Sequence, residues 1–147
     1  MTKTSAAPAG TVLAFDFGTE RIGVAVGETG LGVAHPLATV SNRAGVERFR
    51  AIEALIAQWR PALLLVGLPT HADGTPHTMT ARARRFARQL EGRFTLPVAF
   101  TDERFTTRAA SSALRDAATR ARDRKTVRDS VAAQLILQDY LDRRLAS

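Results

Sequence analysis

Apolar and polar positions along the chain first predict three consecutive strands. Two apolar runs, residues 12–15 and 22–26, flank a short glycine-containing turn, which is the pattern of a β-hairpin. Residues 30–40 predict a third strand, in which Pro36 indicates an edge position or a bulge, because proline cannot donate to a central ladder. Together these three strands form an antiparallel meander.

The chain then alternates helical stripes with short apolar runs. Apolar side chains recur every three or four positions over residues 46–59, which predicts a helix that ends before Pro61. Ser41 or Asn42 is expected to cap the start of this helix. Residues 63–66 are continuously apolar, as in a strand that is covered on both faces.

Glycine and proline residues over 67–76 predict a loop, and a second helix follows it. This helix is expected to open at Thr78 and to end at Gly92. Its inward side is formed by Met79, Ala83, Phe86 and Leu90. Residues 97–101 then predict the fifth strand.

The C-terminal third is predicted to be helical and basic. A third helix is expected to run from Thr106 or Thr107 to about Ala118. Residues 120–128 hold five basic residues and one acid, which is typical of a flexible basic linker. The last helix is expected over about 127–145.

This order of elements predicts an α/β fold with a five-stranded mixed sheet. The meander supplies three antiparallel strands, and the two later strands add in parallel through right-handed crossovers. Residues 11–147 are expected to form one domain, and residues 1–10, which lack an apolar segment, a flexible tail. Ligands of such sheets bind at the carboxyl ends of the parallel strands.

Acids far apart in the sequence are expected at that end of the sheet. Asp16 interrupts an apolar strand, where a carboxylate is costly unless it is paired or holds a cation. It is therefore either a metal ligand or general base, or an acid that caps the turn or pairs with Arg21. Asp102 and Glu103 follow the fifth strand, where alternation puts them on opposite faces, so that only one should belong to a site.

Asp129, near the start of the last helix, has two interpretations. A carboxylate in the first turn is favoured by the helix dipole, which would make Asp129 a structural acid. It also shares a helix face with Ala132, Ala133 and Ile136, and these residues would let the helix approach the sheet closely. On that interpretation Asp129 joins the other acids, and a divalent cation would relieve their repulsion. Oxygen ligands in a chain without cysteine favour Mg²⁺ or Mn²⁺, and the chemistry is metal-assisted phosphodiester hydrolysis.

The formal net charge of +7 lies entirely in residues 82–147, which hold fifteen Lys and Arg against eight Asp and Glu. Guanidinium groups form forked contacts with phosphates, which favours nucleic acid as the partner over a merely solvated surface. The expected phosphate-binding residues are Arg21, Arg82, Arg85, Arg104, Arg124, Lys125 and Arg128. No apolar run approaches the about 20 residues that span a membrane, so a cytoplasmic protein is expected.

Five segments in order resemble the YqgF/RuvX family, whose members are named as pre-16S ribosomal RNA nucleases and described as Holliday-junction-resolvase-like. The segments are A-F-D-F-G-T-E-R-I-G-V-A-V, L-L-V-G-L-P, D-G-T, T-D-E-R-F-T-T and D-S-V-A-A-Q-L-I-L-Q-D-Y-L, within residues 12–141. The resemblance implies an RNase H-like fold and an acidic triad of Asp16, Glu103 and Asp129, with Glu103 rather than Asp102 as the second acid. The chain departs from the family pattern at Gly27-Glu28, where many relatives carry an aspartate, and at Arg128, where relatives often have valine.

Three classes of function compete. The resemblance implies a metal-dependent endonuclease that matures the 5′ end of pre-16S ribosomal RNA, or a DNase resolving branched DNA, acting as a monomer or a homodimer. An actin-like ATPase or sugar kinase shares the motif of residues 16–19 but needs two such domains, which 147 residues do not supply. A non-catalytic RNA-binding factor for ribosome assembly would gain nothing from three clustered carboxylates.

Overall fold

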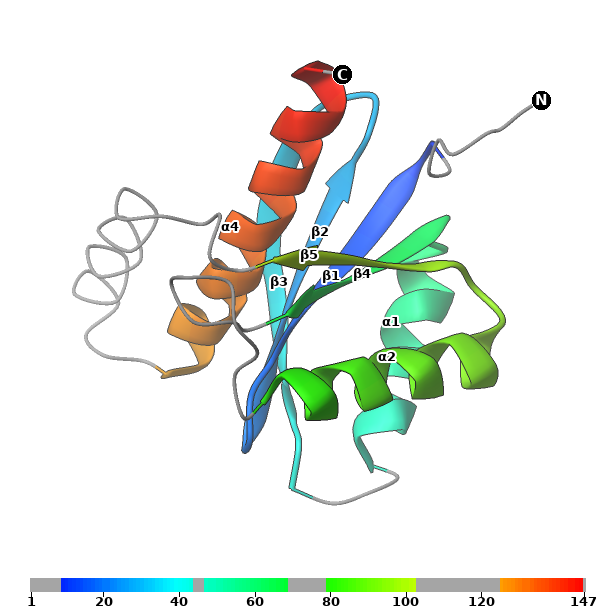
Figure 1. Ribbon diagram of the computed structural model, residues 1–147, viewed down its shortest axis with the longest axis vertical. Helices are drawn as coiled ribbons and strands as arrows, with labels where there is room; N and C mark the ends of the chain where they lie inside the picture. Colours follow the sequence, from blue (N-terminus) through cyan, green and yellow to red (C-terminus); the bar gives the residue numbers. More distant parts are fainter. Residues whose placement is uncertain (1–8, 44–46, 69–78, 103–124, 147) are drawn as a thin grey trace.

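The computed structural model describes residues 9–43, 47–68, 79–102 and 125–146. A twisted sheet forms the middle layer, with α4 on one face and helices α1 and α2 on the other (Figure 1). The elements are β1 (Thr11–Phe17), β2 (Arg21–Glu28), β3 (Val33–Ser41), α1 (Glu47–Trp59), β4 (Leu63–Leu68), α2 (Thr80–Phe94), β5 (Val98–Asp102) and α4 (Lys125–Ala146).

The sheet has the predicted mixed topology, with strand order β3-β2-β1-β4-β5. β1 and β2, and β2 and β3, pair antiparallel, whereas β4 pairs parallel with both β1 and β5. The predicted role of Pro36 is confirmed, because β3 is an edge strand whose register with β2 shifts beside Ala25, the partner of Pro36. The predicted meander with two parallel additions is therefore the architecture of the protein.

The core beneath α1 and α2 is rich in phenylalanine. Phe15 and Phe17 of β1 meet Phe86 of α2, with ring centroids 5.9 and 4.9 Å apart. Phe49 of α1 stacks on Phe86 from the other side, with centroids 6.2 Å apart. Edge-to-face and offset contacts of this kind add to the hydrophobic stabilisation of the core. These rings join both helices to the strand that carries Asp16.

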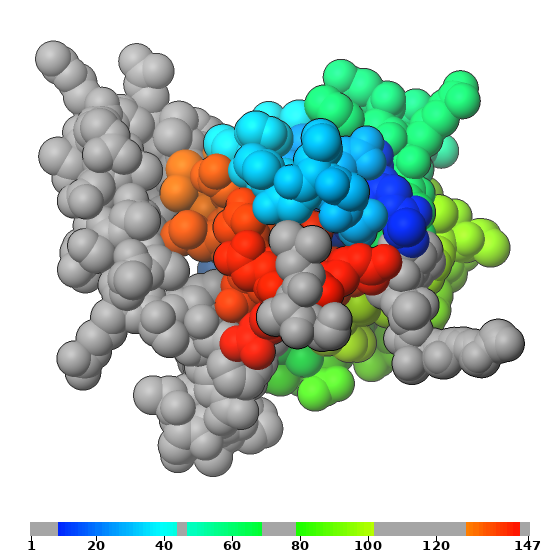
Figure 2. Space-filling view, turned by 90° about the horizontal axis from the view of Figure 1, so that it is seen from above, coloured from blue at the N-terminus to red at the C-terminus, as the bar shows by residue number. Residues whose placement is uncertain are grey.

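The core beneath α4 contains no phenylalanine among its described residues and includes four alanines. Ala14, Ala25 and Ala34 of three neighbouring strands pack against Ala133 of the helix. Short side chains let a helix axis approach a sheet closely, as the alanine face of the helix predicts. Seen from above, the C-terminal half of α4 lies directly against the β2–β3 hairpin (Figure 2).

Two glutamines of α4 also hold the edge strand. The Gln138 side chain accepts a hydrogen bond from the Ala34 N–H at 2.9 Å and donates to the Gly32 carbonyl at 2.9 Å. Gln134 donates to the Ala34 carbonyl at 3.0 Å. Side-chain amides thus satisfy backbone groups that an edge strand otherwise leaves open to pairing with another chain.

Two predicted helix boundaries are wrong. α1 begins at Glu47, so neither Ser41 nor Asn42 caps it; the Asn42 amide donates to the Gly18 carbonyl at 2.7 Å instead. α2 continues past Gly92 to Phe94 and ends where Thr95 takes a left-handed conformation with φ 54°. Gly92 lies at an exposed position, where a helix tolerates glycine at a modest cost.

The last helix also differs from the prediction. α4 begins at Lys125, so the last part of the expected basic linker is its first turn, and Asp129 lies beyond that turn. The helix dipole acts within the first turn, which weakens the interpretation of Asp129 as a helix-start acid. The predicted loop over 67–76 and the predicted helix over 106–118 lie largely or wholly outside the described residues.

Candidate active site

Asp16 lies near the carboxyl end of β1, on the face that α4 covers. Strand alternation puts it on the same side as Val12 and Ala14, both of which belong to the core beneath α4. Its side chain is half-buried. Its register partners are Gly23 in β2 and Gly67 in β4, so neither neighbouring strand places a side chain directly opposite Asp16.

α4 approaches the sheet very closely at Gly23. A Cβ at this position would overlap the carbonyl oxygen of Asp129 and lie 3.2 Å from the backbone nitrogen of Ser130. Gly23 is also the cross-strand partner of Asp16. The backbone of Asp129 therefore lies against the cross-strand partner of Asp16, at the carboxyl end of β1.

The Asp129 carboxylate is held by an ion pair. The Arg21 Nε donates to its Oδ2 at 2.7 Å, and the two side chains are 32% and 25% exposed, respectively. Arg21 begins β2, so the pair ties the start of that strand to α4. The sequence left open that Arg21 pairs with Asp16; the ion pair that the structure shows for Arg21 is with Asp129.

The end of β5 completes this edge of the sheet. Thr101 is the register partner of Gly67, and the backbone of Asp102 pairs with Leu68. Glu103, the acid that the family resemblance selects, comes next and lies outside the described residues. Within the described ranges no group of three His, Cys, Asp or Glu residues could hold a metal ion. The described part of the site therefore consists of Asp16, Asp129 and Arg21.

The carboxylates that are described fit a hard divalent cation in chemical type. Asp16 and Asp129 offer only oxygen donors, which Mg²⁺ and Mn²⁺ prefer. The Asp129 carboxylate also has its Arg21 partner, which would share its charge with a bound cation.

The described side chains among the predicted phosphate-binding residues, those of Arg21, Arg82 and Arg85, lie on opposite faces of the sheet. Arg82 and Arg85 are exposed on α2, across the sheet from Arg21 and Asp129. The backbones of Lys125 and Arg128 belong to the first turn of α4. Arg104 and Arg124 lie outside the described residues.

Sequence reasoning missed Arg48, a half-buried residue near the start of α1. Its guanidinium donates to the Asn42 Oδ1 at 2.6 Å and to the Gln89 Oε1 at 3.2 Å. Burial lowers the pKa of this guanidinium, and the charges of Arg85, Arg93 and Arg82 lower it further. Helical periodicity separates Arg48 from the exposed Arg50, because Arg48 lies four positions before the buried Ile52 and therefore on the same face of α1.

Comparison with known proteins agrees with this architecture. The family model described as RuvX, Holliday junction resolvase, matches residues 10–143. A protein of Nitrosospira multiformis is 54% identical over 145 residues, which cover 99% of this chain and 96% of that protein. A protein of Neisseria gonorrhoeae is 52% identical over 135 residues, which cover 92% of this chain and 89% of that protein. Both carry the name "Putative pre-16S rRNA nuclease".

Solved structures of resolvases share the fold. RuvC of T. thermophilus, in complex with a Holliday junction substrate, matches with a TM-score of 0.53 at 15% identity, covering 92% of this chain and 96% of that one. The fowlpox virus resolvase, in complex with Holliday junction DNA, matches with a TM-score of 0.60 at 9% identity, covering 92% and 99%. The expected RNase H-like fold is confirmed. Among the described helices none is long and apolar enough to cross a membrane.

Proposed function

The chain belongs to the RuvX family of Holliday junction resolvases, and we propose that it is a metal-dependent endonuclease that matures the 5′ end of pre-16S ribosomal RNA. The observation that carries the proposal is the contact of the Asp129 backbone with Gly23, the strand partner of Asp16. A structural helix has no need to bring a carboxylate to the one acid of an otherwise apolar strand. Two such acids at the carboxyl ends of parallel strands suit phosphodiester hydrolysis.

Each acid has a role in this proposal. Asp16 and Asp129, with Glu103 from the segment after β5, hold Mg²⁺ or Mn²⁺. When bound, such a cation stabilises the charge of the phosphate in the transition state and lowers the pKa of an attacking water. Arg21 is a positioning residue, because its ion pair fixes the rotamer of the Asp129 carboxylate. Residues 11–147 form the nuclease domain.

The substrate is assigned from the relatives. Those at 50–54% identity are named for pre-16S rRNA, and precursor ribosomal RNA is processed in the cytoplasm of bacteria, where we place this protein. Branched DNA is the second candidate, which the description of the family favours. Symmetric cleavage of a junction would require a homodimer, whereas a monomer suffices for single-stranded RNA.

A cleavage assay with matched variants tests the proposal. Precursor 16S RNA, unrelated single-stranded RNA and a four-way DNA junction are incubated with Mn²⁺, Mg²⁺ or chelator. We expect metal-dependent cleavage of the precursor, and its loss in Asp16→Asn and Asp129→Asn. Asp139→Asn is the control, because Asp139 is also ion-paired on α4, to Arg143 at 2.8 Å, but lies away from the site. Equal activity in Asp16→Asn and the parent would overturn the assignment.

A further inference from the structure

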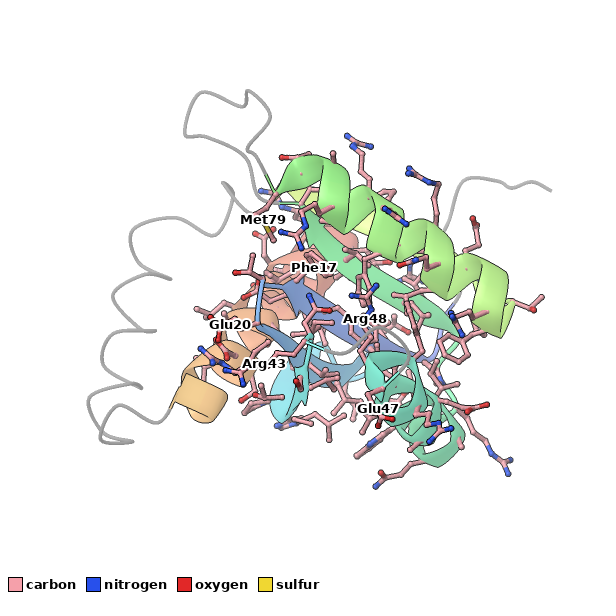
Figure 3. All side chains as sticks on the ribbon, turned by 90° about the horizontal axis from the view of Figure 1, so that it is seen from below. Phe17, Glu20, Arg43, Glu47, Arg48 and Met79 are labelled. Carbon is pink, nitrogen blue, oxygen red and sulfur yellow. The ribbon has the colours of Figure 1, made fainter. Side chains whose placement is uncertain are left out.

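We propose that a pocket between α1 and α2 binds a backbone phosphate of the nucleic-acid substrate at a distance from the scissile bond. The inference rests on the proposed function in that it takes nucleic acid as the partner. The pocket has a volume of about 240 Å³ and is lined by Phe17, Arg48, Arg82, Arg85, Phe86 and Gln89. It opens on the face of the sheet opposite α4 (Figure 3).

The described residues of the pocket concentrate positive charge. Three of the six described lining residues are arginines, and none of these six carries a carboxylate. Arg48 is held by the neutral amides of Asn42 and Gln89, and its buried Nε has no hydrogen-bond partner among the described residues. Arg85, exposed on α2, forms no ion pair with any described residue.

Such an arrangement is costly in the absence of an anion. Like charges repel one another, and burial of a guanidinium without an opposite charge adds to that cost. The lowered pKa of Arg48, caused first by burial and then by its arginine neighbours, agrees with this geometry. A phosphate would accept forked hydrogen bonds from the guanidinium groups and offset both costs.

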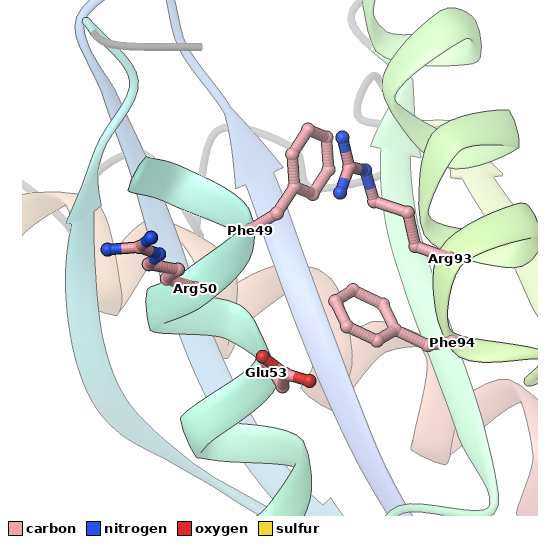
Figure 4. A pocket seen from close by; sticks show the side chains of 5 residues that line it. All are labelled: Phe49, Arg50, Glu53, Arg93 and Phe94. Atoms are coloured by element: carbon pink, nitrogen blue, oxygen red, sulfur yellow. The ribbon is translucent and has the colours of Figure 1, made fainter. Parts of the chain in front are cut away.

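The neighbouring pocket between the same two helices is different in kind. It is lined by Phe49, Arg50, Glu53, Arg93 and Phe94, so an acid is present among its arginines (Figure 4). Arg93 and Arg48 both lie over the Phe49 ring, with their guanidinium groups 4.1 and 4.8 Å from its centroid, so this contact does not distinguish the two pockets. The difference is Glu53, whose negative charge should make this second pocket bind an anion more weakly, and the pocket serves as an internal comparison.

The aromatic residues of the arginine pocket indicate a phosphate rather than a base. Phe17 and Phe86 are only 7% and 1% exposed, so their rings belong to the core and offer no surface on which a base can stack. The contact should therefore be electrostatic and independent of base sequence.

The position of the pocket relates it to the active site. Phe17 directly follows Asp16 in β1, and adjacent residues of a strand face opposite sides of the sheet. A strand cleaved beside Asp16 would reach the pocket by crossing the end of β1. The pocket should therefore strengthen the binding of long oligonucleotides, whereas a short one that ends near the scissile phosphate should bind independently of it.

The test compares Arg85→Gln with Arg88→Gln, an equal loss of charge on the exposed side of α2 outside the pocket. Fluorescence anisotropy measures the affinity of each for labelled single-stranded RNA of increasing length, in chelator and over a range of salt. For long RNA we expect Arg85→Gln to bind about tenfold more weakly. Its salt slope should fall by about 0.7, because one phosphate is no longer neutralised by the protein. Arg88→Gln should match the parent.

Equal affinities of Arg85→Gln and Arg88→Gln for every RNA length would overturn the inference. So would a loss in Arg85→Gln that is as large for the shortest RNA as for the longest. Arg48→Gln distinguishes a phosphate-binding role from a purely structural one. If Arg48 only links Asn42 to Gln89, its substitution should lower the melting temperature without changing the RNA affinity. Binding in chelator does not depend on cleavage. If the parent protein cleaves no substrate but Arg85→Gln still weakens RNA binding, the proposed nuclease function is refuted and the proposed phosphate pocket is supported.

Discussion

Replacing Gly23 with alanine should move the last helix and, with it, Asp129. The new Cβ would overlap the carbonyl oxygen of Asp129 and lie 2.5 Å from its carbonyl carbon. Both atoms belong to the backbone, so they cannot rotate aside as a flexible side chain would. Ordinary contact begins at 3.4 Å, so the helix must retreat by about 1 Å, a displacement that at a catalytic site costs on the order of 100-fold in rate.

Two other glycines provide matched comparisons for stability. Gly23→Ala overpacks the interface with α4 and should cost about 1–3 kcal/mol of unfolding free energy. At Gly27 the new Cβ would lie 3.0 Å from the Val33 carbonyl oxygen and 3.1 and 3.2 Å from the terminal methyls of Leu137 and Leu141, so its cost should be similar or smaller. At Gly92, on α2, an added methyl would have no atom within 4 Å, and alanine there should gain about 0.5–1 kcal/mol.

Urea denaturation and cleavage of precursor RNA are measured on all three variants. We expect Gly27→Ala to lose stability but to keep its turnover at temperatures where it is folded, because Leu137 and Leu141 are distant from Asp129 along α4. Gly23→Ala should lose turnover as well, with weaker Mn²⁺ binding by calorimetry. A Gly23→Ala protein with the turnover and Mn²⁺ affinity of Gly27→Ala would refute the reasoning that this glycine sets the position of Asp129.

Two further predictions concern the partners of α4. Asp129→Asn should lower turnover by more than the about 10–100-fold expected of Arg21→Gln, which removes only the group that orients the carboxylate. In chelator the melting temperature of Asp129→Asn should change little. The substitution removes a partly exposed ion pair worth at most about 1 kcal/mol, but it also relieves the repulsion between residue 129 and Asp16. Gln138→Leu should cost about 1–3 kcal/mol in urea denaturation, because it leaves the Ala34 N–H without its acceptor. An unchanged transition midpoint would show that water replaces the glutamine.

Local sequence patterns were sufficient to predict most of the fold. The two apolar runs around a glycine-containing turn predicted the β1–β2 hairpin, and Pro36 alone predicted an edge strand with an irregular register. Both inferences depend only on residues near one another in the chain. The stripe of Ala83, Phe86 and Leu90 likewise predicted the buried side of α2, and all three residues are buried.

Errors arose where tertiary contacts override local signals. Gly92 resembles a helix end, yet α2 passes through it because Thr95 accepts the left-handed conformation that ends the helix. Residues 125–128 resemble a basic linker, yet they belong to α4, whose packing on β2 and β3 stabilises the whole helix. The partners of Arg48 could not be predicted, because Asn42 and Gln89 come from other parts of the chain.

The two glycines beside Asp16 explain how acids from distant parts of the chain can share one site. A side chain at Gly23 would hold the backbone of Asp129 away from the sheet. Because Gly23 has none, α4 can bring Asp129 toward Asp16 from the side of β2. Gly67 of β4 lies between Asp16 and Thr101 of β5. Because Gly67 has no side chain, groups at the end of β5 can approach Asp16 from that side. In a sequence each glycine looks like an interruption of an apolar strand. In the sheet they flank the same carboxylate, and any larger residue at either position would separate Asp16 from the groups on that side.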